Sequence, residues 1–376
     1  MRKNVLIFSH SDATQFVDIN NQYTRLFDEN KYNVTVAYLV GESTDASKKR
    51  HLAKNILFLN FSKKSIRGLK IHAIKKLLQL HREKNFEIVI CHRYKPTYIM
   101  LWVALFKKIP ALIGVMHDLD TLKSFSRQLL LGLLARKKNT IFAGVSDAVR
   151  DDMRRDISRI LPKNQIVTLY NMIDVPLTEP QFLSREAARK ELNLPNNALI
   201  FGTLGRLVLN KDQKTLIQAF ALIKSAIPTA TLVLIGDGIL ETELKNQVSA
   251  LNLTQEVIFT GYIQQGYRFL KAFDLFILPS IQEAFGRVLL EAMIAKIPII
   301  AARTHGIPEV MGDTGVVIEP ADPQKLADAI LKAHEQLKTD RDEWIQKAYQ
   351  HAERNFSIQR FSEIFWRLPL LQTLKD

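Results

Sequence analysis

The segment Pro279–Ile300, PSIQEAFGRVLLEAMIAKIPII, combines two glutamates, Glu283 and Glu291, with the expected start of a helix. The strongly apolar run DLFIL precedes it at residues 274–278, so the sequence predicts a strand, a loop and then a helix. The amides and the positive dipole end of such a helix start favour an anion such as phosphate. Ionised glutamates accept hydrogen bonds from hydroxyl groups. Together these groups predict a site for a ligand with both features, such as a nucleotide sugar.

Strand-like and helix-like segments alternate along the whole chain on either side of this segment. Apolar runs predict strands near residues 4–9, 33–39, 55–61, 86–91, 111–116, 140–145 and 166–170, and again near residues 199–204, 230–235, 257–260, 274–279, 299–302 and 315–318. Such alternation predicts parallel sheets with helices on both faces. We therefore expect an α/β fold with two Rossmann-like, doubly wound domains, residues 1–177 and residues 178–356, that face a central cleft.

The composition is that of a globular protein large enough for two or three domains, with 376 residues of which 47% are hydrophobic. The single cysteine, Cys91, excludes an intrachain disulfide framework and favours a reducing cytosol. The apolar stretch Val5–Phe8 is too short for a signal peptide, which needs roughly 7–15 apolar residues. The longest apolar run, Tyr98–Phe106, falls far below the ~20 residues of a membrane span. We expect a soluble or peripheral protein.

The positive charge is concentrated in the first half of the chain. Residues 1–177 hold 30 Lys and Arg against 15 Asp and Glu, whereas residues 178–376 hold 22 against 23, so the first half accounts for the whole net charge of +14. A basic surface of this kind indicates an anionic partner, such as a lipid leaflet, a phosphorylated glycan or a nucleic acid.

A second candidate loop follows the strand expected at residues 199–204. Gly205 and Arg206 lie at the end of that strand, and Lys211 lies five residues beyond Arg206. An Arg and a Lys at this spacing are suited to clamping a diphosphate, although a surface loop with two solvated cations is an equal alternative. Gly236 ends the next strand and permits either a tight turn or the close approach of a ligand.

These motifs resemble a known family. GRL at residues 205–207, NKD at 210–212, LVLIGDG at 232–238, FTGYI at 259–263 and the segment 279–300 together look like the C-terminal domain of retaining, GT-B-fold glycosyltransferases of family 4, the glycosyl transferases group 1, over residues 198–332. The first half resembles the family more loosely, through VSDAVRDDM at 145–153 and LYNMID at 169–174. The resemblance implies a GT-B fold, a retaining hexosyltransferase activity and a C-terminal helix, residues 357–376, that packs back on the first domain.

The resemblance also implies roles for individual residues. Glu283 corresponds to the glutamate that lies against the donor sugar, and Glu291 to the one that holds ribose hydroxyls. Arg206 and Lys211 correspond to the basic pair on the diphosphate. Glu283, His117, Arg206 and Lys211 are thus the expected catalytic residues. The expected donor-binding residues are Gly205, Arg206, Lys211, Gly236, Ile263, Glu283, Phe285, Gly286, Arg287, Val288, Leu289 and Glu291.

Within that set, the resemblance assigns contacts by backbone and by position. The amides of Phe285, Gly286 and Arg287 are expected to touch the sugar, and those of Val288 and Leu289 the phosphate. Ile263 follows the FTGY strand, where the family places the base.

Three histidines near strand ends of the first domain are candidates as well. In many relatives a histidine at the position of His117 approaches the transferred sugar, although a lone histidine at a strand end is more often structural. His10 is a candidate contact to donor or acceptor, and His92 is either such a contact or a packing residue. The loop at residues 9–14, SHSDAT, departs from the family because it lacks the usual glycines, so the roles of that loop are not assigned.

The sequence shows no His or Cys cluster with metal-ligand spacing, and the Asp118–Asp120 pair lies in the first domain, away from the expected diphosphate clamp. We therefore expect no metal and no cofactor, with a nucleotide sugar, first of all a UDP-sugar, as co-substrate. Arg206, Lys211 and the helix dipole would stabilise the leaving diphosphate in a metal-independent transfer.

The acceptor is expected to lie with the basic first half. The sequence predicts a helix over residues 62–84 with an apolar stripe that includes Leu69, surrounded by basic residues: Lys63, Lys64, Arg67, Lys70, Lys75, Lys76, Arg82 and Lys84. This face is either simply solvated or in contact with anionic lipid. We expect a glycan or lipid-linked acceptor, as in polysaccharide or lipopolysaccharide biosynthesis, and a cytoplasmic protein, peripheral on the cytoplasmic face of the inner membrane.

Two other functions remain as alternatives. A nucleotide-sugar epimerase shares the fold, although the context of Glu283 and Glu291 disfavours it. A non-catalytic basic binding protein is the other alternative. A nucleic-acid partner is not expected, because the basic half lacks interleaved aromatic residues and any known nucleic-acid motif.

Overall fold

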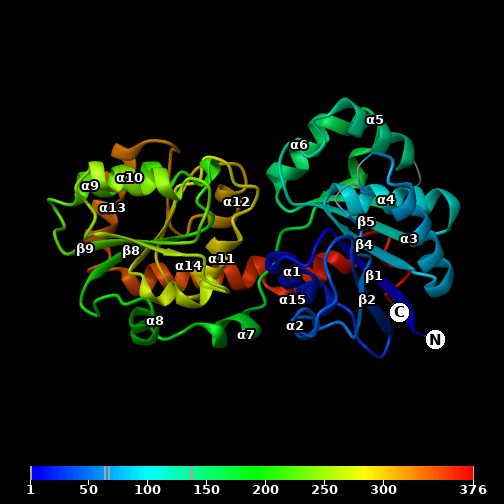
Figure 1. Ribbon diagram of the computed structural model, residues 1–376, viewed down its shortest axis with the longest axis horizontal. Helices are drawn as coiled ribbons and strands as arrows, with labels where there is room; N and C mark the ends of the chain where they lie inside the picture. Colours follow the sequence, from blue (N-terminus) through cyan, green and yellow to red (C-terminus); the bar gives the residue numbers. More distant parts are fainter. Residues whose placement is uncertain (1, 63–64, 67, 136–138, 376) are drawn as a thin grey trace. The chain divides into compact units, whose positions relative to one another are not determined.

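The computed structural model describes residues 2–62, 65–66, 68–135 and 139–375. The chain forms two compact units: unit 1 comprises Met1–Tyr170 and Ile358–Asp376, and unit 2 comprises Asn171–Ser357 (Figure 1). The first division therefore falls a few residues before the expected one after residue 177, and the last segment of the chain groups with unit 1.

Unit 1 is built on a seven-stranded parallel sheet. Its strands are β1 (Lys3–Ser9), β2 (Tyr32–Tyr38), β3 (Asn55–Phe58), β4 (Ile88–His92), β5 (Ala111–Met116), β6 (Thr140–Gly144) and β7 (Ile166–Thr168). They pair in the order β3-β2-β1-β4-β5-β6-β7, so the direction of winding switches between β1 and β4. The central strands are apolar and buried along their whole length, because helices cover both faces of the sheet.

The helices of unit 1 are α1 (Thr14–Thr24), α2 (Asp45–Lys49), α3 (Ile71–Lys84), α4 (Tyr94–Phe106), α5 (Phe125–Leu134), α6 (Asp147–Ile157) and, near the end of the chain, α15 (Ile358–Trp366). Aromatic side chains fix α15 to this unit. Phe361 and Phe365 of α15 lie edge-on to Tyr23 of α1, and Phe365 also lies edge-on to Phe27. Such aromatic pairs contribute about 0.5–1.5 kcal/mol each beyond their buried area.

The expected helix over residues 62–84 was wrong at its start. Helix α3 begins at Ile71, since Gly68 and Lys70 both adopt positive φ angles, 58° and 57°, which a right-handed helix does not accommodate. Leu69, expected in the apolar stripe, is 61% exposed. The three basic residues expected in the first turns, Lys63, Lys64 and Arg67, lie outside the described residues.

Unit 2 is built on a six-stranded parallel sheet. Its strands are β8 (Leu199–Leu204), β9 (Ala230–Ile235), β10 (Val257–Gly261), β11 (Leu275–Leu278), β12 (Ile299–Ala302) and β13 (Val316–Ile318). They pair in the order β10-β9-β8-β11-β12-β13, so the winding switches between β8 and β11. Ligands of doubly wound sheets bind at such a switch point, beyond the carboxyl ends of the strands.

The helices of unit 2 are α7 (Val175–Thr178), α8 (Arg185–Glu191), α9 (Gln213–Ile223), α10 (Glu241–Ala250), α11 (Arg287–Ile294), α12 (Ile307–Met311), α13 (Pro323–Gln336) and α14 (Arg341–Phe356). Helices α9, α10 and α13 pack together on one side of the sheet, and α11 packs against α14 on the other (Figure 1). A hydrophobic core that includes Phe220, Leu232 and Ile277 lies under the first group. Both units are thus Rossmann-like, doubly wound parallel sheets, which confirms the predicted fold class.

A buried ion pair lies at the amino ends of the unit 2 strands, at the edge of the sheet opposite the carboxyl ends. Arg189 of α8 is fully buried, and its guanidinium donates to Asp274, at the start of β11, over 2.8 Å. The same guanidinium donates to the carbonyl oxygens of Ala272 and Ala198 at 3.0 Å. Arg185, one turn earlier on α8, lies 2.7 Å from the other carboxylate oxygen of Asp274. Because this cluster lies at the amino ends of the strands, it supports the sheet rather than the site.

Among the residues that the structure describes, no helix combines the length and the apolar character that crossing a membrane requires.

Candidate functional site

Two loops meet at the switch point of unit 2. The loop after β8 contains the short 3₁₀ helix η3 (Leu209–Lys211), and the carbonyl of Asn210 in it accepts hydrogen bonds from the amides of Ile281 and Gln282, in the loop after β11, at 3.0 and 3.3 Å. The amide of Gly306, after β12, donates to the carbonyl of Glu283 at 3.1 Å. Asn210 and Gly306 were not among the predicted site residues, although Asn210 adjoins Lys211 in the NKD motif.

An ion pair spans these loops. The ammonium of Lys211 bonds to Oε2 of Glu283, and the side chains of the two residues are 18% and 16% exposed. The structure therefore brings together two residues that the sequence placed in one site by separate arguments. Both groups remain partly accessible, so each can exchange its partner for a group of a ligand: the ammonium for a phosphate, and the carboxylate for hydroxyl groups.

Helix α11 begins directly beside this pair. Gly286 precedes it with a φ of 86°, a left-handed conformation that favours glycine, and no side chain caps the helix. The first turn of α11 contains no acidic residue, so its N–H groups and dipole present positive charge. The amide of Leu289 donates to the carbonyl of Gly286 at 2.9 Å, so a ligand would have to share it. Glu291, in the second turn, is partly buried.

The loop after β9 approaches the loop after β8 without space for a side chain. The amide of Gly205 donates to the carbonyl of Ile235 at 3.0 Å, and that of Gly236 to the carbonyl of Gly261 at 2.9 Å. Gly236 has a φ of 135°, and a Cβ atom on it would lie 2.1 Å from the carbonyl oxygen of Gly205. Gly236 is therefore required because the backbone at Gly205 lies so close to it, which is neither of the two roles predicted for it.

The remaining predicted residues of unit 2 differ in exposure. Arg206 is exposed at the end of β8, and Arg287 and Val288 are partly buried in the first turn of α11. Phe285 is buried, with its ring edge-on to Phe356. Ile263 is partly buried after β10, two strands away from β8.

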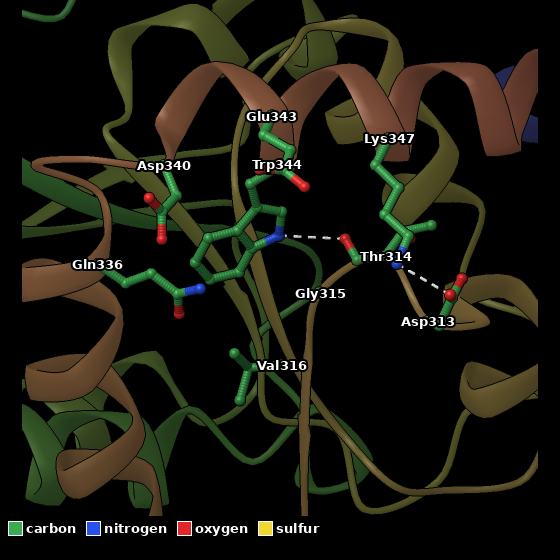
Figure 2. A pocket seen from close by; sticks show the side chains of 9 residues that line it. All are labelled: Asp313, Thr314, Gly315, Val316, Gln336, Asp340, Glu343, Trp344 and Lys347. Atoms are coloured by element: carbon green, nitrogen blue, oxygen red, sulfur yellow. Dashed lines mark hydrogen bonds and ion pairs between the residues drawn. The ribbon is translucent and has the colours of Figure 1, made fainter.

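A cavity of about 340 Å³ in unit 2 lies elsewhere, between β13 and α14. Figure 2 shows Trp344 of α14 donating from its indole to the carbonyl of Thr314, at 3.1 Å, and Lys347 paired with Asp313 at 2.8 Å. These bonds fix α14 against the turn before β13. None of the predicted site residues lines this cavity.

The histidines of unit 1 lie at its own switch point. His92 ends β4 and is fully buried, and its Nδ1 lies 3.0 Å from Nε2 of His117, which follows β5. The ring of His117 lies edge-on to Phe16 at 5.9 Å. His10, directly after β1, lines the same cavity as His117. The structure thus brings the three predicted histidines to one edge of the sheet, with His92 beneath His117 as a supporting residue.

Burial lowers the pKa of His92 to about 3. The unfolded chain binds the proton near pH 6.5 and the folded protein only near pH 3, so the unfolded state holds more protons between these values. The free energy of unfolding should therefore fall as the pH drops below 6.5, by about 1.4 kcal/mol per pH unit from His92 alone. We expect His92→Gln to remove this contribution, as measured by urea unfolding across that range.

Only the pH-dependent difference from the wild type is diagnostic, because His92→Gln also alters packing at every pH. His72→Gln, on the exposed face of α3, is the matched control and should leave the slope unchanged. Parallel stability curves for the wild type and His92→Gln would show that His92 is not the buried neutral group described above.

Among the described residues, no group of three or more His, Cys, Asp or Glu side chains could hold a metal ion. Asp118 lies 3.2 Å from Arg93, and Asp120 lies 3.8 Å from Arg155.

Solved structures share this architecture over the whole chain. One is Alr3699/HepE of Anabaena in complex with UDP and glucose, with a TM-score of 0.78 and 21% identity over 100% of both chains. At this identity the likeness concerns the fold alone. Two Rossmann-like units with the candidate loops at a switch point place the protein in the GT-B fold class.

Family models cover most of the sequence. Residues 184–351 match glycosyl transferases group 1, and residues 22–176 match glycosyltransferase family 4. The chain belongs to the family 4 type of glycosyltransferases.

The sequence is also similar to individual named proteins. N-acetyl-alpha-D-glucosaminyl L-malate synthase of Bacillus anthracis is 28% identical over 68% of each chain. N-acetylgalactosamine-N,N'-diacetylbacillosaminyl-diphospho-undecaprenol 4-alpha-N-acetylgalactosaminyltransferase of Campylobacter jejuni is 26% identical over 65% of this chain and 66% of its own.

Proposed function

We propose that this protein transfers a sugar from a nucleotide sugar, first of all a UDP-sugar, to a glycan or lipid-linked acceptor. The pairing of Lys211 with Glu283 at the switch point of unit 2, beside the start of α11, carries the proposal. Binding of UDP and glucose by the Anabaena protein supports the donor class. The diphospho-undecaprenol in the name of the C. jejuni relative supports a lipid-linked acceptor.

In this proposal the donor spans the two loops and the helix start. Lys211 and Arg206 hold the diphosphate, together with amides of the first turn of α11, including that of Val288. Glu283 positions the sugar, with the amides of Phe285, Gly286 and Arg287 beside it. Glu291 accepts hydrogen bonds from the ribose, and Gly205, Gly236 and Ile263 border the nucleotide.

The proposed transfer retains the anomeric configuration and needs no metal. The acceptor hydroxyl oxygen bonds to the anomeric carbon on the face from which the nucleotide departs. The bond between that carbon and the diphosphate breaks with both electrons on the diphosphate, and an oxygen of the departing diphosphate takes the hydroxyl proton. Arg206, Lys211 and the dipole of α11 offset the charge that develops there. The retaining course follows from the family resemblance.

We assign the acceptor to unit 1, with His117 approaching the transferred sugar and His10 bordering the acceptor. We further propose a cytoplasmic protein in peripheral contact with the anionic face of the inner membrane. Phe125, Leu129 and Leu133 recur along α5 with 76%, 45% and 52% exposure. An apolar stripe on a basic unit is typical of helices that bind membrane surfaces.

A thermal-shift panel of UDP-, GDP- and ADP-sugars tests the proposal. At about a hundredfold excess over Kd, the true donor should stabilise the protein by about 2.7 kcal/mol, or roughly 5–10 °C in Tm for a unit of this size. Glu291→Ala should lose most of this shift, because the ribose loses its carboxylate. Glu243→Ala, exposed on α10, is the matched control and should keep it.

Product analysis with the stabilising donor then separates the functions. Release of the nucleoside diphosphate with sugar transfer or hydrolysis supports a glycosyltransferase. Interconversion of the sugar on an intact nucleotide would indicate the epimerase, and no stabilisation by any nucleotide sugar would contradict the proposal.

A further inference from the structure

A cavity of about 500 Å³ lies in unit 1, at the carboxyl edge of the sheet beside β1, β4 and β5. Four cationic side chains line it: Lys70, Arg93, Lys95 and Arg127. His10 and His117 form part of the same wall. The one carboxylate in the lining, Asp118, lies 3.2 Å from Arg93. The cavity is therefore strongly positive at its surface.

Three helices start at this cavity, and none of them is capped. Lys70 precedes α3, Arg93 precedes α4, and Ser124 precedes α5, and none of these side chains accepts a hydrogen bond from its helix. The first turns of all three helices contain no acidic residue. A helix start carries partial positive charge, so cations at three such starts oppose the dipoles unless an anion is bound.

The cations influence one another. Burial lowers the pKa of Lys70, and Lys95 and Arg127 lower it further. Burial likewise lowers the pKa of His10, with further contributions from Lys95 and Arg93. Among the described residues, these four cations form a single ion pair, that of Arg93 with Asp118. The like charges thus gather here with little compensation from the protein itself.

Other contacts hold the cations in place. The ammonium of Lys70 donates to the carbonyl of Gly68 at 2.7 Å and lies 4.5 Å from the ring centre of Tyr98. The guanidinium of Arg127 donates to the carbonyl of Thr121 at 2.8 Å and lies 4.8 Å from the ring centre of Tyr94. Groups fixed in this way lose less freedom when they bind a ligand.

We propose that this cavity binds a phosphoryl group, a phosphate monoester or diphosphate, carried by the acceptor, with Lys70, Arg93, Lys95 and Arg127 as the residues that select it. The statement that the acceptor carries this group rests on the proposed glycosyl transfer. The anion site itself is argued from residues of unit 1 alone. A phosphoryl group brings about −1.5 to −2 charges and three acceptor oxygens, more than a single carboxylate offers to several converging donors. The cavity also has room for an attached sugar.

Calorimetric titration of the full-length protein with inorganic pyrophosphate tests the site. The titration uses a Lys211→Ala background, which weakens the other place where a diphosphate would bind. We expect Lys95→Gln with Arg127→Gln to lower the affinity about a hundredfold, roughly tenfold for each charged hydrogen bond. Lys75→Gln with Arg82→Gln, a Lys and an Arg exposed on α3, is the matched control and should change it less than about twofold. The charge-conserving pair Lys95→Arg with Arg127→Lys should keep most of the affinity.

Equal losses in the cavity pair and the control pair, or no loss in either, would overturn the proposal. Two further probes then identify the source of the phosphoryl group: a hexose 1-phosphate in solution, and vesicles of phosphatidylcholine that contain phosphatidic acid. Binding of either one that depends on Lys95 and Arg127 supports the proposal and names the source. If both substitutions leave vesicle binding unchanged, the membrane contact lies elsewhere, and this result would count against the proposal.

The experiments can distinguish a failure of the anion site from a failure of the proposed transferase function. Stabilisation by a nucleotide sugar without pyrophosphate binding in the cavity would leave the transferase standing and remove the phosphorylated acceptor. Pyrophosphate binding that depends on Lys95 and Arg127, without stabilisation by any nucleotide sugar, would leave the anion site standing and remove the transferase.

Discussion

Lys211→Ala is expected to lower kcat/KM for glycosyl transfer by about 10²–10³-fold, equivalent to about 2.7–4 kcal/mol of transition-state stabilisation. The ammonium of Lys211 bonds to Glu283 in the free protein and lies beside the start of α11. In the proposed transfer, the diphosphate departs beside this ammonium and the start of α11, so both would offset the negative charge that develops on it. Removing the ammonium also leaves the carboxylate of Glu283 to repel the diphosphate.

Release of the nucleoside diphosphate, measured with the donor identified by thermal shift, reports the effect. Lys214→Ala, exposed at the start of α9, is the matched control and should retain full activity. The combination of Lys211→Ala with Glu283→Gln should cost less than the sum of the two single changes, since the residues act as a pair. A Lys211→Ala protein with the activity of the wild type would exclude the assigned role.

Arg189→Met is expected to lower the free energy of unfolding of unit 2 by about 3–5 kcal/mol. The substitution leaves the carbonyls of Ala272 and Ala198 without their donor and removes one of the two arginines from Asp274. Buried charges and carbonyls that lose a partner cost far more than the pair itself contributes. Combining Arg189→Met with Asp274→Leu should recover part of the loss, because no buried carboxylate then remains.

Urea unfolding followed by tryptophan fluorescence can isolate unit 2. The chain has three tryptophans. If every protein compared carries Trp102→Phe and Trp366→Phe, the fluorescence comes from Trp344 of α14 and follows the unfolding of unit 2. Arg185→Met is the control, because its side chain is 38% exposed and its ion pair should contribute no more than about 1 kcal/mol. An Arg189→Met protein within about 0.5 kcal/mol of the wild type would show that the pair is dispensable.

The fold was predictable because buried parallel strands appear in the sequence as continuous apolar runs. Strands such as β4, β5 and β11 lie where those runs predicted them. The start of α3 was not predictable in this way, since Leu69 fits a helical stripe and yet is 61% exposed. Two residues with positive φ set that boundary, and apolar periodicity carries no signal for them.

For the candidate site as well, single residues were predictable from the sequence, but the contacts between distant residues were not. Glu283 and Lys211 were predicted from their own loops, but their ion pair, 72 residues apart in sequence, follows only from the adjacency of β8 and β11. The pair of Arg189 and Asp274, 85 residues apart, gave no local signal at all. Three cations of the unit 1 cavity, Arg93, Lys95 and Arg127, were missed for another reason. Each one alone resembles a solvated surface charge, and only the fold brings three helix starts together around them.

Unit 2 begins and ends at one place. Ile173, near its first residue, forms a parallel bridge with Ser357, its last, and donates to the carbonyl of Phe356 at 2.8 Å. A segment whose two ends are joined in this way is a self-contained insertion in the chain of unit 1. Recombination at just two neighbouring positions would exchange it whole, without cutting a strand of either sheet. In the proposed function, where unit 2 binds the donor and unit 1 the acceptor, such an exchange would change the donor and leave the acceptor specificity unchanged.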